Sequence, residues 1–266
     1  MLNNELWQKP TSGGGAFYSY QIEQSARFDK GSSSSLTKTW GGNATDGTKA
    51  TFSVWLKRGE LGGTYDIISA DDSSNFTMLE FMTNSASDQL YFQLGRESNA
   101  SSPQAAITNA QYRDTGGFMN IVYAVDASET GADQQKLYMN GTRLTSFSAD
   151  TLAARAMSGS DTWAITRNGR TAQIGKKAST NYFDGYMAEI VCIDGTDYGA
   201  DSFGETKNGV LIPKDPSCLT FGNYGFYLKF QNASALGDDS SGNNNDFTAN
   251  NMGADHQVLD SPTFGS

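Results

Sequence analysis

The sequence contains little cysteine and a single histidine, and these shortages exclude several classes of site. Cys192 and Cys218 are its only cysteines, too few for a disulfide scaffold, and they lack the CxxC spacing of a zinc site. His256 stands alone in the polar segment NMGADHQVLD, so we expect it to be neither a metal ligand nor a base. No Gly-x-Ser-x-Gly motif supplies the serine of a hydrolase triad.

Positive charge and long apolar runs are also scarce. The chain has 19 Lys and Arg against 29 Asp and Glu, and no basic cluster offsets the formal charge of −10. Such a chain repels phosphate backbones, so nucleic-acid binding is not expected. No apolar stretch is long enough to cross a bilayer, and the polar start MLNNELWQKP does not resemble a secretory signal. We therefore expect no membrane insertion.

Convincing helices are missing, and short alternating segments take their place. Residues 51–57 set Phe52, Val54 and Leu56 on one face, as a half-buried strand does, and residues 88–95 and 118–126 repeat the pattern. Asn-Gly at the centre of KLYMNGTRL predicts a tight hairpin turn. Further short strands are predicted at WAITR (163–167), AQIGK (172–176) and GFYLKF (225–230). With 29 Gly and 5 Pro, the sequence predicts an all-β antiparallel sandwich or jelly roll.

Four segments, taken in order, resemble laminin-G-like, concanavalin A-type jelly rolls. They are SARFDKGSSSSLTKTW (25–40), TFSVWLKRG (51–59), LYMNGTRL (137–144) and FDGYMAEIVCIDG (183–195). The resemblance covers residues 21–250 and implies an antiparallel jelly roll of two sheets. Residues 1–20 are then an N-terminal arm and residues 251–266 a C-terminal tail. The exact residues of these segments are most similar to those of domains in tailed-phage virion proteins. This resemblance implies a protein that is made in the host cytoplasm and carried on the virion surface.

One departure from the family pattern predicts a circular permutation. In many relatives a strand followed by an Asp-x-Ser-Gly-Asn-x-Asn loop precedes the first Phe-Asp strand. Here the matching piece, FYLKFQNASALGDDSSGNNNDFT (226–248), lies near the C-terminus. Because sandwich termini often end close together, a shifted cut leaves the same strand pairings. Residues 226–230 should therefore pair in the sheet that contains residues 25–29.

Catalysis is not expected from the acids of NYFDGYMAEIVCID (181–194). Glucanases of this fold carry their acids at period-two spacing on one strand face, where two can flank a glycosidic bond. Glu189 and Asp194 are five positions apart, so a regular strand sends them to opposite faces. A β-bulge is the one device that could realign them. We expect no catalytic residue and no hydrolytic activity.

Calcium is the one cofactor for which the sequence offers donors. The segment GDDSSGNNNDF carries the hard oxygen donors Asp238, Asp239, Asn243, Asn245 and Asp246. It lacks the spacing of an EF-hand loop, and the alternative is a Gly/Asn turn that tolerates left-handed backbone. The turn is the favoured interpretation.

Three aromatic residues are candidates for glycan binding. Tyr112, Trp163 and Tyr182 fall at strand ends or in loops, where rings can stack on sugars. The alternative is that they cover the ends of the sandwich. Trp55 breaks the inward row of its strand, so we expect it to pack under a covering loop or on a neighbouring subunit.

Two classes of function remain after these exclusions. The first is a non-enzymatic virion accessory protein, in capsid decoration or in the tail or fibre, with other virion proteins as partners. The second is a dedicated adhesin for host cell-surface glycans; a concanavalin A-type glycoside hydrolase is a weaker third alternative. The arm carries Trp7 as an apolar anchor and Gly13–Gly15 as a flexible joint, so we expect it to contact a neighbour in a homo-oligomer.

Overall fold

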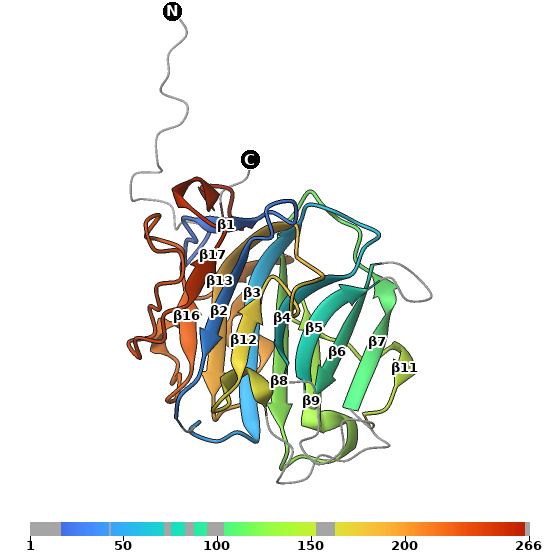
Figure 1. Cartoon of the computed structure of the whole chain (residues 1–266). Helices are drawn as coiled ribbons and strands as arrows, with labels where there is room; N and C mark the ends of the chain where they lie inside the picture. Colours follow the sequence, from blue (N-terminus) through green and yellow to red (C-terminus); the bar gives the residue numbers. More distant parts are fainter. Residues whose placement is uncertain are drawn as a thin grey trace, which may run out of the picture.

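Two large antiparallel β-sheets packed face to face form the body of the protein (Figure 1). The computed structural model describes residues 17–42, 44–71, 76–82, 88–94, 104–152 and 163–263. The predicted two-sheet jelly roll is confirmed. No helix in these ranges is long and apolar enough to span a membrane.

One eight-stranded sheet, sheet A, has the order β10-β9-β8-β3-β13-β1-β18, with β16 also paired to β13. Its strands are β1 (Ser25–Phe28), β3 (Lys49–Arg58), β8 (Met119–Asp126), β9 (Gln135–Met139), β10 (Thr142–Arg143), β13 (Gly185–Asp194), β16 (Phe226–Leu228) and β18 (Gln257–Val258). The predicted turn joins β9 to β10, where Asn140 and Gly141 both have positive φ, 48° and 79°.

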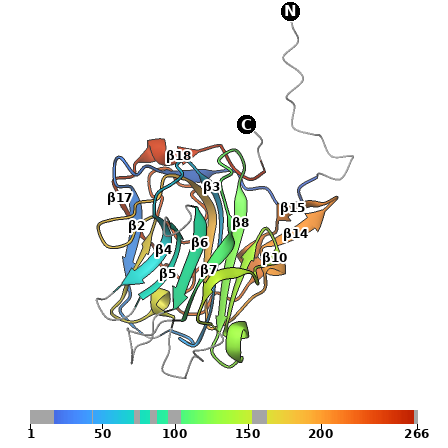
Figure 2. The same ribbon diagram turned by 90° about the vertical axis from the view of Figure 1, so that its right-hand side faces the viewer.

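The other eight-stranded sheet, sheet B, has the order β11-β7-β6-β5-β4-β12-β2-β17. Its strands are β2 (Ser35–Thr39), β4 (Tyr65–Asp71), β5 (Phe76–Met82), β6 (Gln89–Leu94), β7 (Gln104–Gln111), β11 (Phe147–Asp150), β12 (Thr171–Ile174) and β17 (Thr248–Asn250). A separate hairpin, β14 (Gly204–Lys207) and β15 (Val210–Pro213), stands on the outer side of sheet A (Figure 2).

Five short 3₁₀ helices occur within the described ranges: η2 (Gly131–Gln134), η3 (Ala164–Thr166), η4 (Ala200–Ser202), η5 (Pro216–Cys218) and η6 (Ala254–His256). The predicted strand at WAITR is wrong, because these residues form η3. Trp163 donates its backbone N–H to the carbonyl of Gly47, and Ala164 donates to the hydroxyl of Thr77, so no ladder can form.

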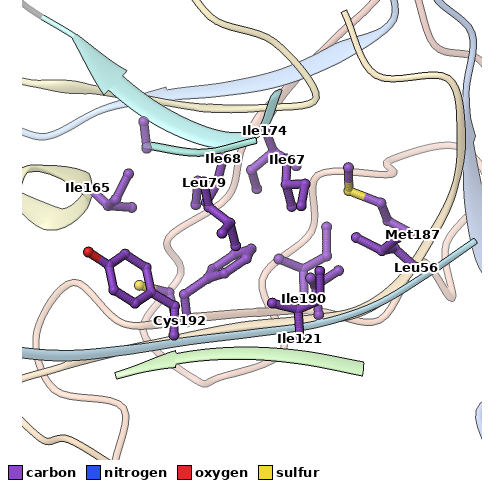
Figure 3. Packing of buried hydrophobic residues seen from close by; sticks show 14 of the residues in the cluster. Leu56, Ile67, Ile68, Leu79, Ile121, Ile165, Ile174, Met187, Ile190 and Cys192 are labelled. Atoms are coloured by element: carbon purple, nitrogen blue, oxygen red, sulfur yellow. The ribbon is translucent and has the colours of Figure 1, made fainter. Parts of the chain in front are cut away.

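The main core lies between the two sheets, where alternate side chains of both meet (Figure 3). The inward row Phe52, Val54 and Leu56 of β3 is fully buried in it, as predicted. The opposite row, Thr51, Ser53 and Trp55, is buried as well, so β3 is not the half-buried strand that was predicted. Cys192 is also fully buried there and packs as a small hydrophobe.

A β-bulge interrupts β13. Against β3, Ala188 pairs with Trp55 and Val191 with Ser53, so Glu189 and Ile190 together oppose one residue. Glu189 has φ of 48°, a left-handed conformation that is costly for a residue with a side chain. Because of the bulge, Met187 points into the main core together with Ile190 and Cys192, although strict alternation would place it opposite to them.

The edge of β13 that faces away from β3 is shared by two strands from opposite ends of the chain. β1 pairs with residues 185–187 and β16 with residues 190–192, both antiparallel. The predicted pairing of residues 226–230 in the sheet of residues 25–29 is therefore confirmed. Glu189 lies at the junction between the two short strands.

Both ends of the described chain pack on the sandwich. Ile22 is buried against Trp55 and Ala188 on the outer face of sheet A, so Trp55 lies under a covering segment, one of the two positions expected for it. At the other end, β18 pairs with β1, and the hydroxyls of Ser261 and Thr263 donate to the Ile22 carbonyl. Residues 251–263 of the predicted C-terminal tail (251–266) thus pack on the sandwich.

Candidate functional site

A hollow of about 240 Å³ opens at the end of the sandwich where β7 ends and β8 begins. We call it the Tyr112 hollow. It is lined by Gln111, Tyr112, Arg113, Asp114, Gly117, Phe118, Met119 and Asn140. Residues 111–118, the Tyr112 loop, supply most of the lining, and Met119 of β8 and Asn140 of the β9–β10 turn supply the rest. Tyr112 is one of the three aromatic residues predicted to bind glycan.

A buried ion pair holds the Tyr112 loop from beneath. Arg58 and Asp88 lie 2.9 Å apart, and their side chains are only 1% and 4% exposed. The other arm of the Arg58 guanidinium donates to the carbonyl of Tyr112 at 2.6 Å, and the backbone N–H of Tyr112 donates to the carbonyl of Asp88 at 2.8 Å. The loop is therefore fixed by charged and backbone hydrogen bonds before any ligand arrives.

The electrostatics of this anchor favour a charged Asp88. Burial acts to raise the pKa of Asp88, but hydrogen bonds from the Gly62 N–H and from two arginines outweigh it and hold that pKa below its usual value. The second arginine is Arg113, whose Nε lies 3.1 Å from the carboxylate and whose side chain is 55% exposed. Burial lowers the pKa of Arg58. Arg113 thus links the buried pair to the surface of the hollow.

The hollow presents both aromatic and polar groups. Phe118 is half-buried, and Tyr112 is half-buried with its ring packed on the main core and its hydroxyl inside. Asp114 accepts the N–H of Gly116 at 2.8 Å, which shapes the loop, and Asn140 accepts the N–H of Asn120 through Oδ1. Aromatic surface beside carboxylate, amide and guanidinium groups can contact the apolar face and the hydroxyl edge of a sugar.

The two other predicted glycan-binding aromatics lie elsewhere. Trp163 is 1% exposed, and its ring packs edge-on against Tyr123 in the main core. The prediction for Trp163 is therefore wrong, because neither ring face is accessible to a sugar. Tyr182 is half-buried and follows Asn181, whose carbonyl accepts the Asp66 N–H, and it is not part of the Tyr112 hollow.

Glu189 lies on the outer face of sheet A, away from the Tyr112 hollow. It is 6% exposed and accepts hydrogen bonds from the hydroxyls of Tyr20 and Tyr227. Burial raises its pKa to about 7, against the opposing effect of the Tyr227 hydrogen bond. Asp194 follows the inward alternation of Ile190 and Cys192, and its carboxylate accepts the N–H groups of Thr45 and Tyr224. The bulge lies at Glu189 and Ile190, and regular alternation resumes from Ile190 onward. Asp194 therefore points to the inner side of sheet A and Glu189 to the outer side, so the two acids still face opposite ways.

Residues 29–196 match the family Laminin_G_3, the concanavalin A-like lectin/glucanases superfamily. The match spans well over half of the chain. The chain belongs to this family. No curated protein matches this concanavalin A-like domain.

Solved structures share the fold at low sequence identity. A proposed carbohydrate-binding protein from Bacteroides ovatus aligns at 13% identity and a TM-score of 0.62, covering 93% of this chain and 63% of that one. A heptameric SAP-like pentraxin from Limulus polyphemus aligns at 13% identity and a TM-score of 0.45, and the alignment covers 67% of this chain and 79% of that one. The tailspike protein 2 enzymatically active domain of bacteriophage CBA120 aligns at 9% identity and a TM-score of 0.46, and the alignment covers 66% of this chain and 26% of that one. The domain thus spans less than two thirds of the Bacteroides protein.

Sequence reasoning missed an acid pair on the outer face of sheet B of this concanavalin A-like domain. Asp66 and Glu80 are register partners on β4 and β5, and both are buried. Burial, and then the neighbouring Glu80 carboxyl, raise the pKa of Asp66 well above its usual value, and burial raises that of Glu80. Because two neighbouring carboxylates repel each other in a buried site, the pair favours a state in which at least one carboxyl is protonated over the state in which both are charged. Only knowledge of the strand register could have paired them.

The segment proposed for calcium uses its side chains as internal hydrogen-bond groups. Asp239 accepts from the N–H groups of Tyr227, Ser241 and Asn245 and from the Ser241 hydroxyl. Asp246 accepts the N–H of Asp239, and Asp238 accepts from the Asn232 amide. These contacts hold the segment as a hydrogen-bonded polar turn.

The two asparagines of that segment tie it to the preceding loop. Asn243 donates to the carbonyls of Gly222 and Gly225, and Asn245 donates to those of Asn223 and Gly225. Across the residues that the structure describes, no group of three or more His, Cys, Asp or Glu side chains could hold a metal ion.

Proposed function

We propose that this domain binds carbohydrate without cleaving it, as an accessory protein on the surface of a tailed-phage virion. The observation that carries the binding function is the Tyr112 hollow. It combines Phe118 and part of the Tyr112 ring with polar side chains, on a loop that a buried ion pair holds in place. Preorganised loops of this kind lose little entropy when a ligand binds.

The arrangement of acids supports binding over hydrolysis. A retaining glycosidase needs two carboxyls about 5 Å apart that face one groove, and an inverting enzyme needs both to face it from further apart. Glu189 is covered by Tyr20 and Tyr227, and Asp194 caps a loop at the far end of β13. Asp66 and Glu80 are buried and face each other. Neither pair can flank a glycosidic bond in this geometry.

The virion role is supported by the sequence resemblance to phage proteins. We propose partners among the capsid or tail proteins. The N-terminal arm would make the contact through its own Trp7, a residue that lies outside the described residues. A homo-oligomer, or symmetric attachment to the particle, follows from this assignment. The alternative is an adhesin that binds host glycans on its own, and the binding module would be the same in both.

Glycan binding can be tested on the purified full chain with immobilised polysaccharides and oligosaccharides. We expect binding by the wild type, and a loss of about tenfold or more in Arg113→Ala and Phe118→Ala. Tyr182→Ala tests the remaining predicted aromatic, which lies outside the hollow, and it should bind normally because we propose the hollow as the site. Circular dichroism of each variant verifies that the fold is retained. Absence of binding to any probe, or equal binding by all the variants, would contradict the proposal.

Localisation separates the virion role from that of a free adhesin. Purified phage particles should contain the protein in a fixed ratio to the major capsid or tail protein, measured by quantitative mass spectrometry. Antibody labelling in electron micrographs would then show whether it lies on the head or on the tail. A protein absent from washed particles would reject the virion assignment and leave the adhesin.

A further inference from the structure

A second hollow, of about 260 Å³, lies beside the first on the outer side of sheet A. We call it the Tyr18 hollow. Its lining residues are Tyr18, Trp55, Gly116, Gly117, Phe118, Val210, Leu211, Asp260, Ser261 and Pro262. Four separate segments therefore meet around it: the N-terminal segment, the Tyr112 loop, the β14–β15 hairpin and the segment after β18. Trp55, 5% exposed, contributes from β3.

The two hollows meet at Gly117 and Phe118, which line both of them. Gly117 has no positive φ, and a Cβ built there would touch only the Asp114 side chain, at 3.5 Å. The backbone would therefore accept a side chain at this point, on the boundary that the two hollows share.

Size argues that one ligand uses both spaces. Small-molecule sites usually measure about 300–1,000 Å³. The Tyr112 hollow, at about 240 Å³, and the Tyr18 hollow, at about 260 Å³, each fall short of that range. Joined through Gly117 they lie within it.

The chemistry of the second hollow continues that of the first. Tyr18 is half-buried, and Phe118 is common to both, so aromatic surface extends from Tyr112 past Phe118 to Tyr18. Lys57 pairs with Asp260, and its ammonium lies 5.4 Å from the centre of the Phe118 ring, which places polar groups beside the aromatic row. Aromatic rings flanked by polar groups suit successive sugar residues of one chain.

We infer that the ligand is an oligosaccharide chain of three or more sugar residues that crosses Gly117 and occupies both hollows. The inference rests on the proposed carbohydrate-binding function and specifies the substrate class of that site. A single sugar or a disaccharide would occupy only one hollow and would make no contact with the residues of the other. Affinity should therefore rise with chain length until both hollows are occupied.

The test compares disaccharides with pentasaccharides by isothermal titration calorimetry on the full chain. The probes are matched pairs cut from β-glucan, xylan, chitin and bacterial capsular polysaccharide. For the series that binds, we expect the pentasaccharide to bind at least about tenfold more tightly than the disaccharide. Gly117→Leu should remove this difference, because its side chain blocks the crossing at Gly117, and should lower pentasaccharide affinity to about that of the wild type for the disaccharide. Tyr18→Ala should weaken only the pentasaccharide.

Gly41→Leu is the matched control, since a Cβ at Gly41 would meet nothing within 4 Å and its φ is not positive. It should retain the full dependence on chain length. Equal affinity for disaccharide and pentasaccharide in the wild type, or an unchanged length dependence in Gly117→Leu, would overturn the inference and leave the carbohydrate-binding function standing. Absence of binding to every probe would overturn both.

Discussion

The hydroxyl of Tyr20 lies 3.1 Å from the carboxylate of Glu189, 169 positions further along the chain. Tyr227 donates to the same carboxylate and is itself 2.8 Å from the Tyr20 hydroxyl. Glu189 therefore joins the N-terminal segment to β16 at the bulge of β13. This buried acid adds to the packing of Ile22 on Trp55 in holding the covering segment on the sheet.

Stability should decrease as pH rises, because the pKa of Glu189 is raised to about 7 from an ordinary value of 4.5. A raised pKa in the folded state means that the protonated acid is the stabilised form. Its contribution is complete below pH 4.5 and is lost as pH rises through 7. The charged groups near it are Lys229, which lowers the pKa, and Asp215, which raises it. Urea unfolding at pH 5 and pH 8 should differ by up to about 3 kcal/mol from this group.

Glu189→Gln is the variant that assigns this pH dependence. Glutamine cannot titrate, so the variant should lose most of the difference between pH 5 and pH 8, and at pH 5 it should change stability only slightly. A smaller slope of the same sign should remain, because Asp66 and Glu80 also have raised pKa values. A variant with the full wild-type slope would show that Glu189 is not responsible.

Asp88→Asn should cost about 3–5 kcal/mol, since it leaves the buried guanidinium of Arg58 without its counter-charge. Asparagine keeps the shape of the side chain and tolerates the φ of 71° at this position. Arg113→Ala removes the exposed partner of the same carboxylate and should cost less than about 1 kcal/mol. Thermal and urea unfolding of the two variants measure the contrast. Similar losses in both would contradict the buried anchor.

Deleting residues 1–16 should leave the unfolding free energy within about 0.5 kcal/mol of the full chain. Incorporation of this truncated protein into particles should fall, because the proposed assembly contact, Trp7, is gone. Deleting residues 1–24 also removes Ile22, which is 1% exposed, and Tyr20, and should cost about 3 kcal/mol or more. Unchanged occupancy on the particle after the shorter deletion would reject the arm as the contact.

Hydrolysis should be absent. Purified protein incubated with β-glucans or host polysaccharide is expected to release no reducing ends above the background. Glu189→Gln and Glu80→Gln are the informative variants, because they neutralise one member of each acid pair considered above. Cleavage by the wild type that either substitution abolishes would establish an enzyme.

Alternation predicted the fold because every second side chain of the core strands points into the space between the two sheets. Phe52, Val54 and Leu56 lie inward as their period of two requires, and Asn140–Gly141 turns as its positive φ values allow. The bulge could not be predicted, since it occurs at a glutamate and no glycine marks it.

The candidate site was predictable only in part. Tyr112 was identified from its place at a strand end, but Arg58 and Asp88, which fix it, come from distant positions that no local pattern joins. The prediction for Trp163 was wrong because this residue precedes η3, not a strand end, and its ring is buried in the core.

The shared edge of β13 has a consequence for synthesis on the ribosome. β13 can pair with β3 once residue 194 has been synthesised, but its other partner, β16, begins only at Phe226. Until then, part of a central strand presents open N–H and C=O groups, with only β1 from the start of the chain beside them. An unpaired strand edge on a nascent chain invites association with other chains. Slow translation or truncation between residues 195 and 225 should therefore yield aggregation-prone intermediates, and the last forty residues complete the sheet that the first thirty began.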